Sequence, residues 1–171
     1  MNKLQYTEQQ KALALIDRFR PECDGLQWAF PHIDKTDFLN SLRKLISEPE
    51  KISQQRHPIC GITVAIKIAA TLDPINLVKL AAHLFANGSF QHKSFLISRI
   101  KVPKNLTEIQ DFNGLSPAEF VLSATIKAFY NPLTGYFANP SSFLSNWQGV
   151  TFPGQIRKFL TQYFNKELVP S

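Results

Sequence analysis

Cys60 and Gln54 are the two residues whose type and spacing could do chemistry. Cys60 is followed by Gly61 and a long apolar run, and Gln54 stands six residues before it. A thiol in the first turn of a helix lies where the helix N-terminus stabilises negative charge, which favours the nucleophilic thiolate. A glutamine amide beside that thiol could donate a hydrogen bond to a developing oxyanion. The pair therefore indicates attack by Cys60 on a carbonyl carbon, with Gln54 holding the oxyanion.

A thiol nucleophile also needs a general base within hydrogen-bond reach, and the candidates are the four histidines. We take His92 as the candidate base because its segment has extended character, from which it could face a cleft. His57 stands three residues before Cys60 in a polar loop and is the local alternative. His83 is expected in the interior or at the boundary of a helix, and His32 in a loop without a role.

The spacing of apolar residues predicts a mainly α-helical fold of about six helices, which would position these side chains. The helix over residues 59–72 is apolar on nearly all sides, so we expect it to be central and buried. Asp73-Pro74 and Ser116-Pro117 each combine a cap with a proline and predict two further helix starts. A minor β element is expected near residues 90–101. The remaining helices are expected over residues 7–20 with Thr7 as the N-cap, from Asp34 or Thr36 to Ile46, after Pro140 and after Pro153.

The length of 171 residues predicts a single domain, because it allows one real core and is short for two. Within residues 1–171, we expect residues 1–50 to form an N-terminal helical extension. Residues 51–167 would then form the core that carries the Cys60 helix. A hydrophobic fraction of 44% with 19% charged residues is typical of a globular protein and argues against disorder.

Charge and cysteine content weigh against several classes of protein. The net charge of +6 is modest and its basic residues are scattered, so nucleic-acid binding is only a weak alternative. Neither Cys23 nor Cys60 has zinc-ligand spacing, so we expect no metal and no cofactor. No apolar run approaches the roughly 20 residues that span a bilayer, and the first residues lack a secretory signal. We expect a protein without a membrane span that is cytoplasmic as synthesised, or that leaves the cell by a signal-peptide-independent route.

A helix beginning at Cys60-Gly61, with Gln54 upstream, resembles the α-helical lobe of papain-like cysteine peptidases. The wider pattern is similar to papain-fold domains of bacterial polymorphic toxins and secreted effectors. This resemblance implies Cys60 as the nucleophile, Gln54 as the oxyanion residue, a protein or peptide substrate, and a cognate immunity protein as partner. The residues that carry the wider pattern are Cys60-Gly61, Asp73-Pro74, residues 84–88 and Phe152-Pro153-Gly154.

The family takes its catalytic histidine and the Asn/Asp partner from a β-rich lobe downstream, whereas this chain has no histidine after His92. Family members also place a bulky residue soon after the cysteine, where this chain has Ile62 and Thr63. Two interpretations remain open. The chain is the helical lobe of a longer cysteine peptidase whose second lobe is missing, or it is a non-catalytic helical binding module such as an inhibitor, adaptor or regulator.

Overall fold

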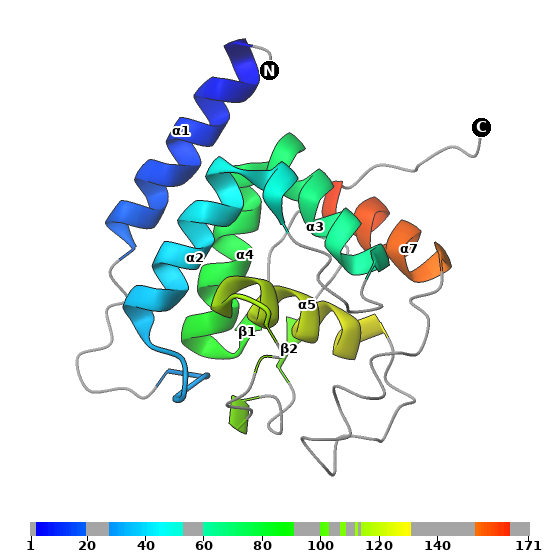
Figure 1. Cartoon of the computed structure of the whole chain (residues 1–171). Helices are drawn as coiled ribbons and strands as arrows, with labels where there is room; N and C mark the ends of the chain where they lie inside the picture. The colour runs from blue at the N-terminus through cyan, green and yellow to red at the C-terminus, as the bar shows by residue number, and fades with distance from the viewer. Residues whose placement is uncertain are drawn as a thin grey trace.

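The computed structural model describes residues 3–19, 28–52, 60–90, 100–102, 107–108, 112, 114–130 and 153–164. In these residues the fold is mainly α-helical, which confirms the predicted fold class (Figure 1). The described elements are α1 (Lys3–Arg18), α2 (Lys35–Ser47), the 3-10 helix η1 (Pro49–Lys51), α3 (Cys60–Leu72), α4 (Pro74–Asn87), β1 (Ser89–Phe90), β2 (Ile100–Lys101), α5 (Pro117–Tyr130) and α7 (Pro153–Phe164). The two strands pair antiparallel, with Ser89 opposite Lys101 and Phe90 opposite Ile100, at the position predicted for the β element.

The predicted cap residues start three of the helices. Asp34 caps α2, since its Oδ1 accepts a hydrogen bond from the backbone N–H of Asp37 at 3.0 Å. Asp73 caps α4 ahead of Pro74. At the start of α5, the Glu119 carboxylate accepts hydrogen bonds from the backbone N–H of Ser116 at 2.9 Å and from its hydroxyl at 2.6 Å. Each cap satisfies backbone donors that have no partner within the helix.

The prediction for the first helix was wrong at its N-terminal end. α1 begins at Lys3 and not after Thr7, and it ends at Arg18. No proline or glycine stands between Lys3 and Thr7, and the lysine, leucine and glutamine there are good helix formers, so the helix extends past the expected cap. The short helix expected after Pro140 lies outside the described residues.

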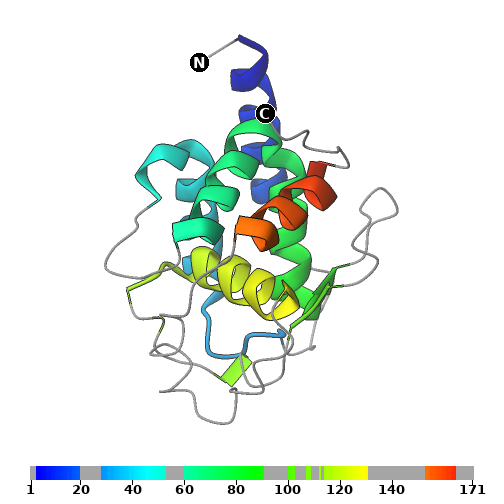
Figure 2. The same ribbon diagram turned by 90° about the vertical axis from the view of Figure 1, so that its right-hand side faces the viewer.

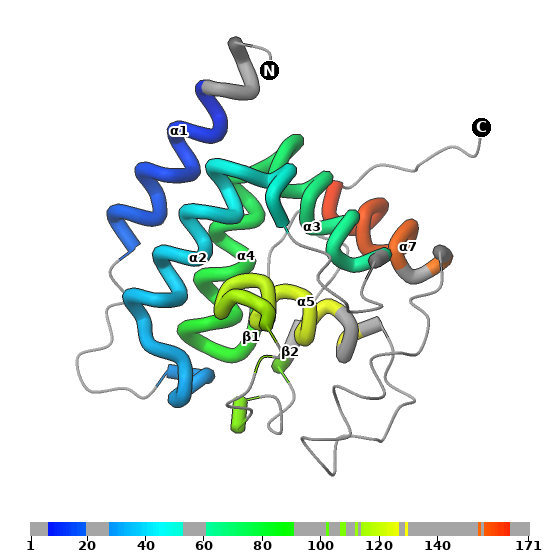
Figure 3. Tube along the Cα trace, viewed as in Figure 1, coloured from blue at the N-terminus to red at the C-terminus, as the bar shows by residue number. Residues whose placement is uncertain are grey.

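The helices form one packed body around a common core. α1 packs against α2 and α4, and α2 packs against α5 (Figure 3). α3 contacts α1, α2, α4, α5 and α7, which gives it the central position that the sequence predicts. Figure 2 shows α7 beside α3, with α5 crossing below both. α3 is nevertheless not covered on all sides, because Val64 is 40% exposed and Leu72 is 68% exposed.

An aromatic stack ties the segment before α2 to the rest of the core. The rings of Phe38 and Phe85 stack with their centroids 4.1 Å apart, and Trp28 stacks on Phe85 at 5.5 Å. Phe30 meets Phe120 edge to face at 6.3 Å. Phe30, Phe38, Phe85 and Phe120 are fully or almost fully buried. The Phe38–Phe85 stack therefore joins α2 to α4, and the Phe30–Phe120 pair joins the segment before α2 to α5.

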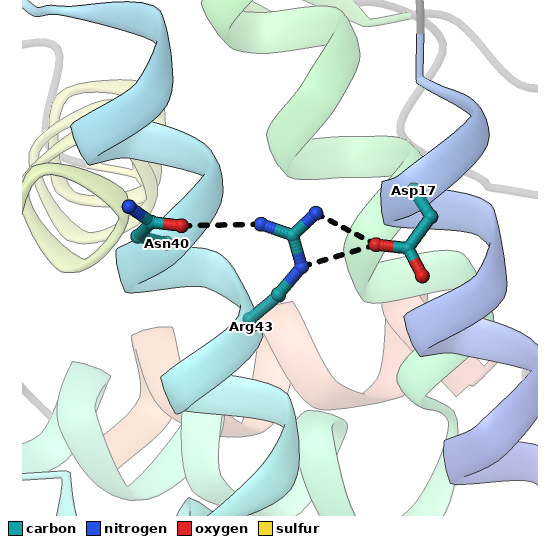
Figure 4. Close-up of polar contacts among 3 residues, drawn as sticks. All are labelled: Asp17, Asn40 and Arg43. Carbon is teal, nitrogen blue, oxygen red and sulfur yellow. Dashed lines mark hydrogen bonds and ion pairs between the residues drawn. The ribbon is translucent and has the colours of Figure 1, made fainter.

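Two polar contacts hold α1 against α2. The guanidinium of Arg43 donates to Asp17 Oδ1 at 2.6 and 3.1 Å and to Asn40 Oδ1 at 3.2 Å (Figure 4). The side-chain amide of Gln9 donates to the backbone oxygen of Ile46 at 2.7 Å and to that of Ser47 at 3.1 Å. Because carbonyls at a helix C-terminus have no partner within the helix, Gln9 supplies one and holds the end of α2 in place.

Candidate functional site

The thiol position that the sequence singled out lies at the start of α3. The helix begins at Cys60, within one residue of the predicted range of 59–72, and its first turn contains no acidic residue. The partial positive charge of the helix N-terminus is therefore not offset by a carboxylate in that turn. Gln54, His57 and His92, together with the side chain of Cys60, lie outside the described residues. Of the predicted site, the described residues therefore include the start of the helix at Cys60. They include none of these four side chains.

The body of α3 is held firmly behind its first turn. Ile62 and Ile66 are buried in the core, and Thr63 is also buried. The ammonium of Lys67 also donates to the backbone oxygen of Glu50 in η1 at 3.3 Å. Cys60 is therefore the first residue of a helix that packs into the centre of the protein.

α7 packs against α3 and bonds to the residue that follows its C-terminal end. Phe159 and Leu160 are buried, and the hydroxyl of Tyr163 donates to the backbone oxygen of Asp73 at 2.7 Å. Burial raises the pKa of Tyr163 well above its ordinary value, and the negative charge of Asp73 adds to the effect. Tyr163 therefore stays neutral over the physiological range and acts as a structural hydrogen-bond donor.

The two described histidines both lie at the surface. His83 is exposed on α4 and does not lie in the interior. Its Nδ1 is 3.4 Å from the side-chain nitrogen of Asn87, and its ring meets Phe90 edge to face at 5.7 Å. His32 is exposed in the loop before α2, as predicted.

Neither a cluster of metal ligands nor a membrane-spanning helix is found among the described residues. Within them, no group of three or more His, Cys, Asp or Glu side chains is close enough to hold a metal ion. None of the described helices is both long and apolar enough to cross a membrane. Acidic and basic side chains do gather at a different place, a pocket that the sequence did not predict.

This pocket has a volume of about 330 Å³ and lies between the C-terminal half of α2, η1 and the start of α5. Sequence signals marked the Glu48-Pro49 link and the Ser116-Pro117 helix start separately. What brings them together is the contact between α2 and α5, in which the backbone N–H of Ala118 donates to Ser41 Oγ at 2.9 Å. The described residues that line the pocket are Ser41, Lys44, Leu45, Glu48, Lys51, Ile52, Gly114, Leu115, Ser116 and Glu119.

No protein-family model matches this chain, and neither does any curated protein or solved structure. The resemblance to papain-like peptidases therefore rests on the sequence motifs alone.

Proposed function

We propose that this chain is a thiol-dependent hydrolase or acyl-transfer domain in which Cys60 is the nucleophile. The observation that carries the proposal is that α3, a helix of 13 residues, begins at Cys60 and has no acidic residue in its first turn. A helix N-terminus carries a partial positive charge of roughly half a unit, which favours a thiolate over a thiol. The buried residues behind Cys60 supply a rigid support for this first turn.

In the proposed reaction, the Cys60 thiolate attacks the carbonyl carbon of a protein or peptide substrate. The carbonyl electron pair moves onto oxygen, and the Gln54 amide with the Cys60 backbone N–H would stabilise that oxyanion. The oxyanion collapses to a thioester as the amine leaves, taking a proton from a histidinium, for which His92 is the candidate in this chain. Water or another acceptor then gives a proton to the now neutral histidine and attacks the thioester. The acyl group leaves as an acid or a transferred product, which regenerates the thiolate and the histidinium.

The wider biological assignment belongs to the same proposal. A role as a bacterial toxin or secreted effector, with a cognate immunity protein or a second lobe as partner, is supported by the motif resemblance around Cys60 and Asp73-Pro74. The chemistry at Cys60 does not depend on that role, so it is the part to test first.

The test is the pH dependence of iodoacetamide labelling at Cys60, read by mass spectrometry, with Cys23 as the internal comparison. We expect Cys60 to react with an apparent pKa clearly below the roughly 8.5 of a free thiol. Labelling in denaturant is the control, because unfolding removes the helix and should make the two thiols alike. A Cys60 that is inert, or that titrates like Cys23 in the folded protein, would refute the nucleophile.

A second function, a non-catalytic helical binding module, is favoured by the exposed side of α3. Val64 and Leu72 are the exposed large apolar side chains of the described residues, and the partly buried Ile68 lies between them on the same face. Contiguous exposed apolar side chains mark contact surfaces. This function predicts two ordinary thiols in the labelling test. It also predicts that Leu72→Lys abolishes complex formation with a cognate partner while the free energy of unfolding stays unchanged.

A further inference from the structure

The pocket between α2, η1 and α5 combines an apolar floor with a charged rim. Leu45 and Ile52 are 3% and 6% exposed, and Leu115 is partly buried against the same core. Lys44 and Lys51 are exposed at the rim. Its volume of about 330 Å³ is at the small end of the range for pockets that hold organic molecules. The floor suits an apolar group and the rim suits a charged one.

Most polar groups of the lining already have partners within the protein. Glu119 accepts two hydrogen bonds from Ser116, and it stands in the first turn of α5, where the helix N-terminus offsets its negative charge. Glu48 pairs with Lys51 at 3.2 Å. The hydroxyl of Ser41 donates to the backbone oxygen of Phe38 at 2.8 Å and accepts from Ala118. None of these groups needs a ligand to be satisfied.

Lys44 is the exception among the described lining residues. No hydrogen bond or ion pair within the described part of the chain involves its ammonium. Lys44 and Leu45 both line the pocket, so a positive charge with no partner among the described residues lies beside the apolar floor. A cation would meet the positive charge of Lys44, whereas the carboxylates that an anion would meet already have partners, Lys51 for Glu48 and Ser116 for Glu119. The lining therefore favours an anionic head.

We propose that this pocket binds a small organic carboxylate with an apolar body. The carboxylate accepts a hydrogen bond from Lys44 Nζ, and the body covers Leu45, Ile52 and Leu115. The proposal goes beyond thiol chemistry and holds whether or not Cys60 is reactive. Because Lys44 is exposed, solvent screens the charge pair and its share of the affinity is small.

The test is a titration of the full chain with octanoate, followed by amide resonances in two-dimensional NMR. We expect the shifted resonances to map to residues 44–52 and 114–119. Replacing Lys44 by glutamine keeps the length of the side chain and removes its charge, so affinity should fall about fivefold, or about 1 kcal/mol. Lys79→Gln is the matched control, because Lys79 is an exposed helical lysine outside the pocket, and it should leave affinity unchanged.

Two further ligands test the contributions of the carboxylate and of the apolar body separately. We expect 1-octanol, which lacks the charge, and acetate, which lacks the apolar body, to bind more weakly than octanoate. The proposal is overturned if octanoate does not bind, if it shifts resonances elsewhere, or if Lys44→Gln binds it as well as the natural chain does. Equal affinities for octanoate and 1-octanol would likewise overturn it, because apolar contact alone would then explain binding.

Discussion

Replacing Tyr163 by phenylalanine tests how α7 is held against the end of α3. The substitution removes the hydroxyl that donates to the Asp73 backbone oxygen at 2.7 Å. It keeps the ring, which is 3% exposed and contacts Phe159 and Phe164. That carbonyl also accepts from the backbone N–H of Leu77 at 3.2 Å, so the substitution does not leave it without a donor.

The expected loss is therefore that of one net hydrogen bond, about 1 kcal/mol of unfolding free energy at neutral pH. A second effect appears in alkali. Burial and the Asp73 charge raise the pKa of Tyr163 in the folded state. Above pH of about 10, the unfolded chain releases this proton while the folded protein keeps it. The contribution of Tyr163 to the free energy of unfolding is therefore complete below a pH of about 10 and is lost as the pH rises further.

The assay is urea unfolding of the natural chain and Tyr163→Phe, each measured from neutral to strongly alkaline pH. The contributions of the other tyrosines cancel in the difference between the two proteins. We expect the advantage of the natural chain to shrink and then reverse as pH rises above about 10. A difference that does not change with pH would refute the buried neutral hydroxyl. A loss above about 3 kcal/mol at neutral pH would mean that the substitution disrupts packing of α7.

Three further substitutions test local features of the fold by urea unfolding. Gly88→Ala should lower the free energy of unfolding by more than about 1 kcal/mol, because Gly88 has φ +63 and an added Cβ would lie 3.0 Å from the Cβ of Ala29. An unchanged free energy of unfolding would contradict this geometry. Ser116→Ala should lower the free energy of unfolding by about 1 kcal/mol, because it removes the hydroxyl that accepts from the backbone N–H of Glu119 at 3.5 Å and donates to the Glu119 carboxylate at 2.6 Å. Ser116→Thr, which keeps a hydroxyl, should lower it less. Arg43→Gln should lower the free energy of unfolding by less than about 1 kcal/mol, because the Arg43 side chain is 40% exposed and solvent screens its ion pair with Asp17. The loss should be smaller still in high salt, which screens the pair further.

The features that the sequence predicted well are those made by near neighbours in the chain. The caps at Asp34, Asp73 and Ser116 each join residues three positions apart, so the residue types alone predict them. The start of α1 was missed because a capping residue shows where a helix can begin and does not stop one that has good helix formers before it. Cap signals therefore predict helix ends best where a proline or glycine reinforces them, as Pro74 does for α4.

The features that the sequence did not predict depend on how distant segments pack. Apolar spacing identified α3 as a core helix, but spacing does not tell which apolar side chains find a neighbour, and Leu72 remains 68% exposed. The pocket likewise depends on the contact between Ser41 and Ala118, which are 77 residues apart in the chain. Only the packing of α2 on α5 places Lys44 and Glu119 around one cavity.

The two proposals can fail independently, because different parts of the fold support them. The proposed reactivity of Cys60 depends on the N-terminus of α3. The pocket depends on the end of α2, which Gln9 holds through the backbone oxygens of Ile46 and Ser47, and on the cap of α5. Lys44→Gln should therefore weaken octanoate binding and leave the labelling of Cys60 unchanged. If the substitution instead slowed that labelling, the charge at Lys44 would influence the thiol, and the two sites would have to be treated as one.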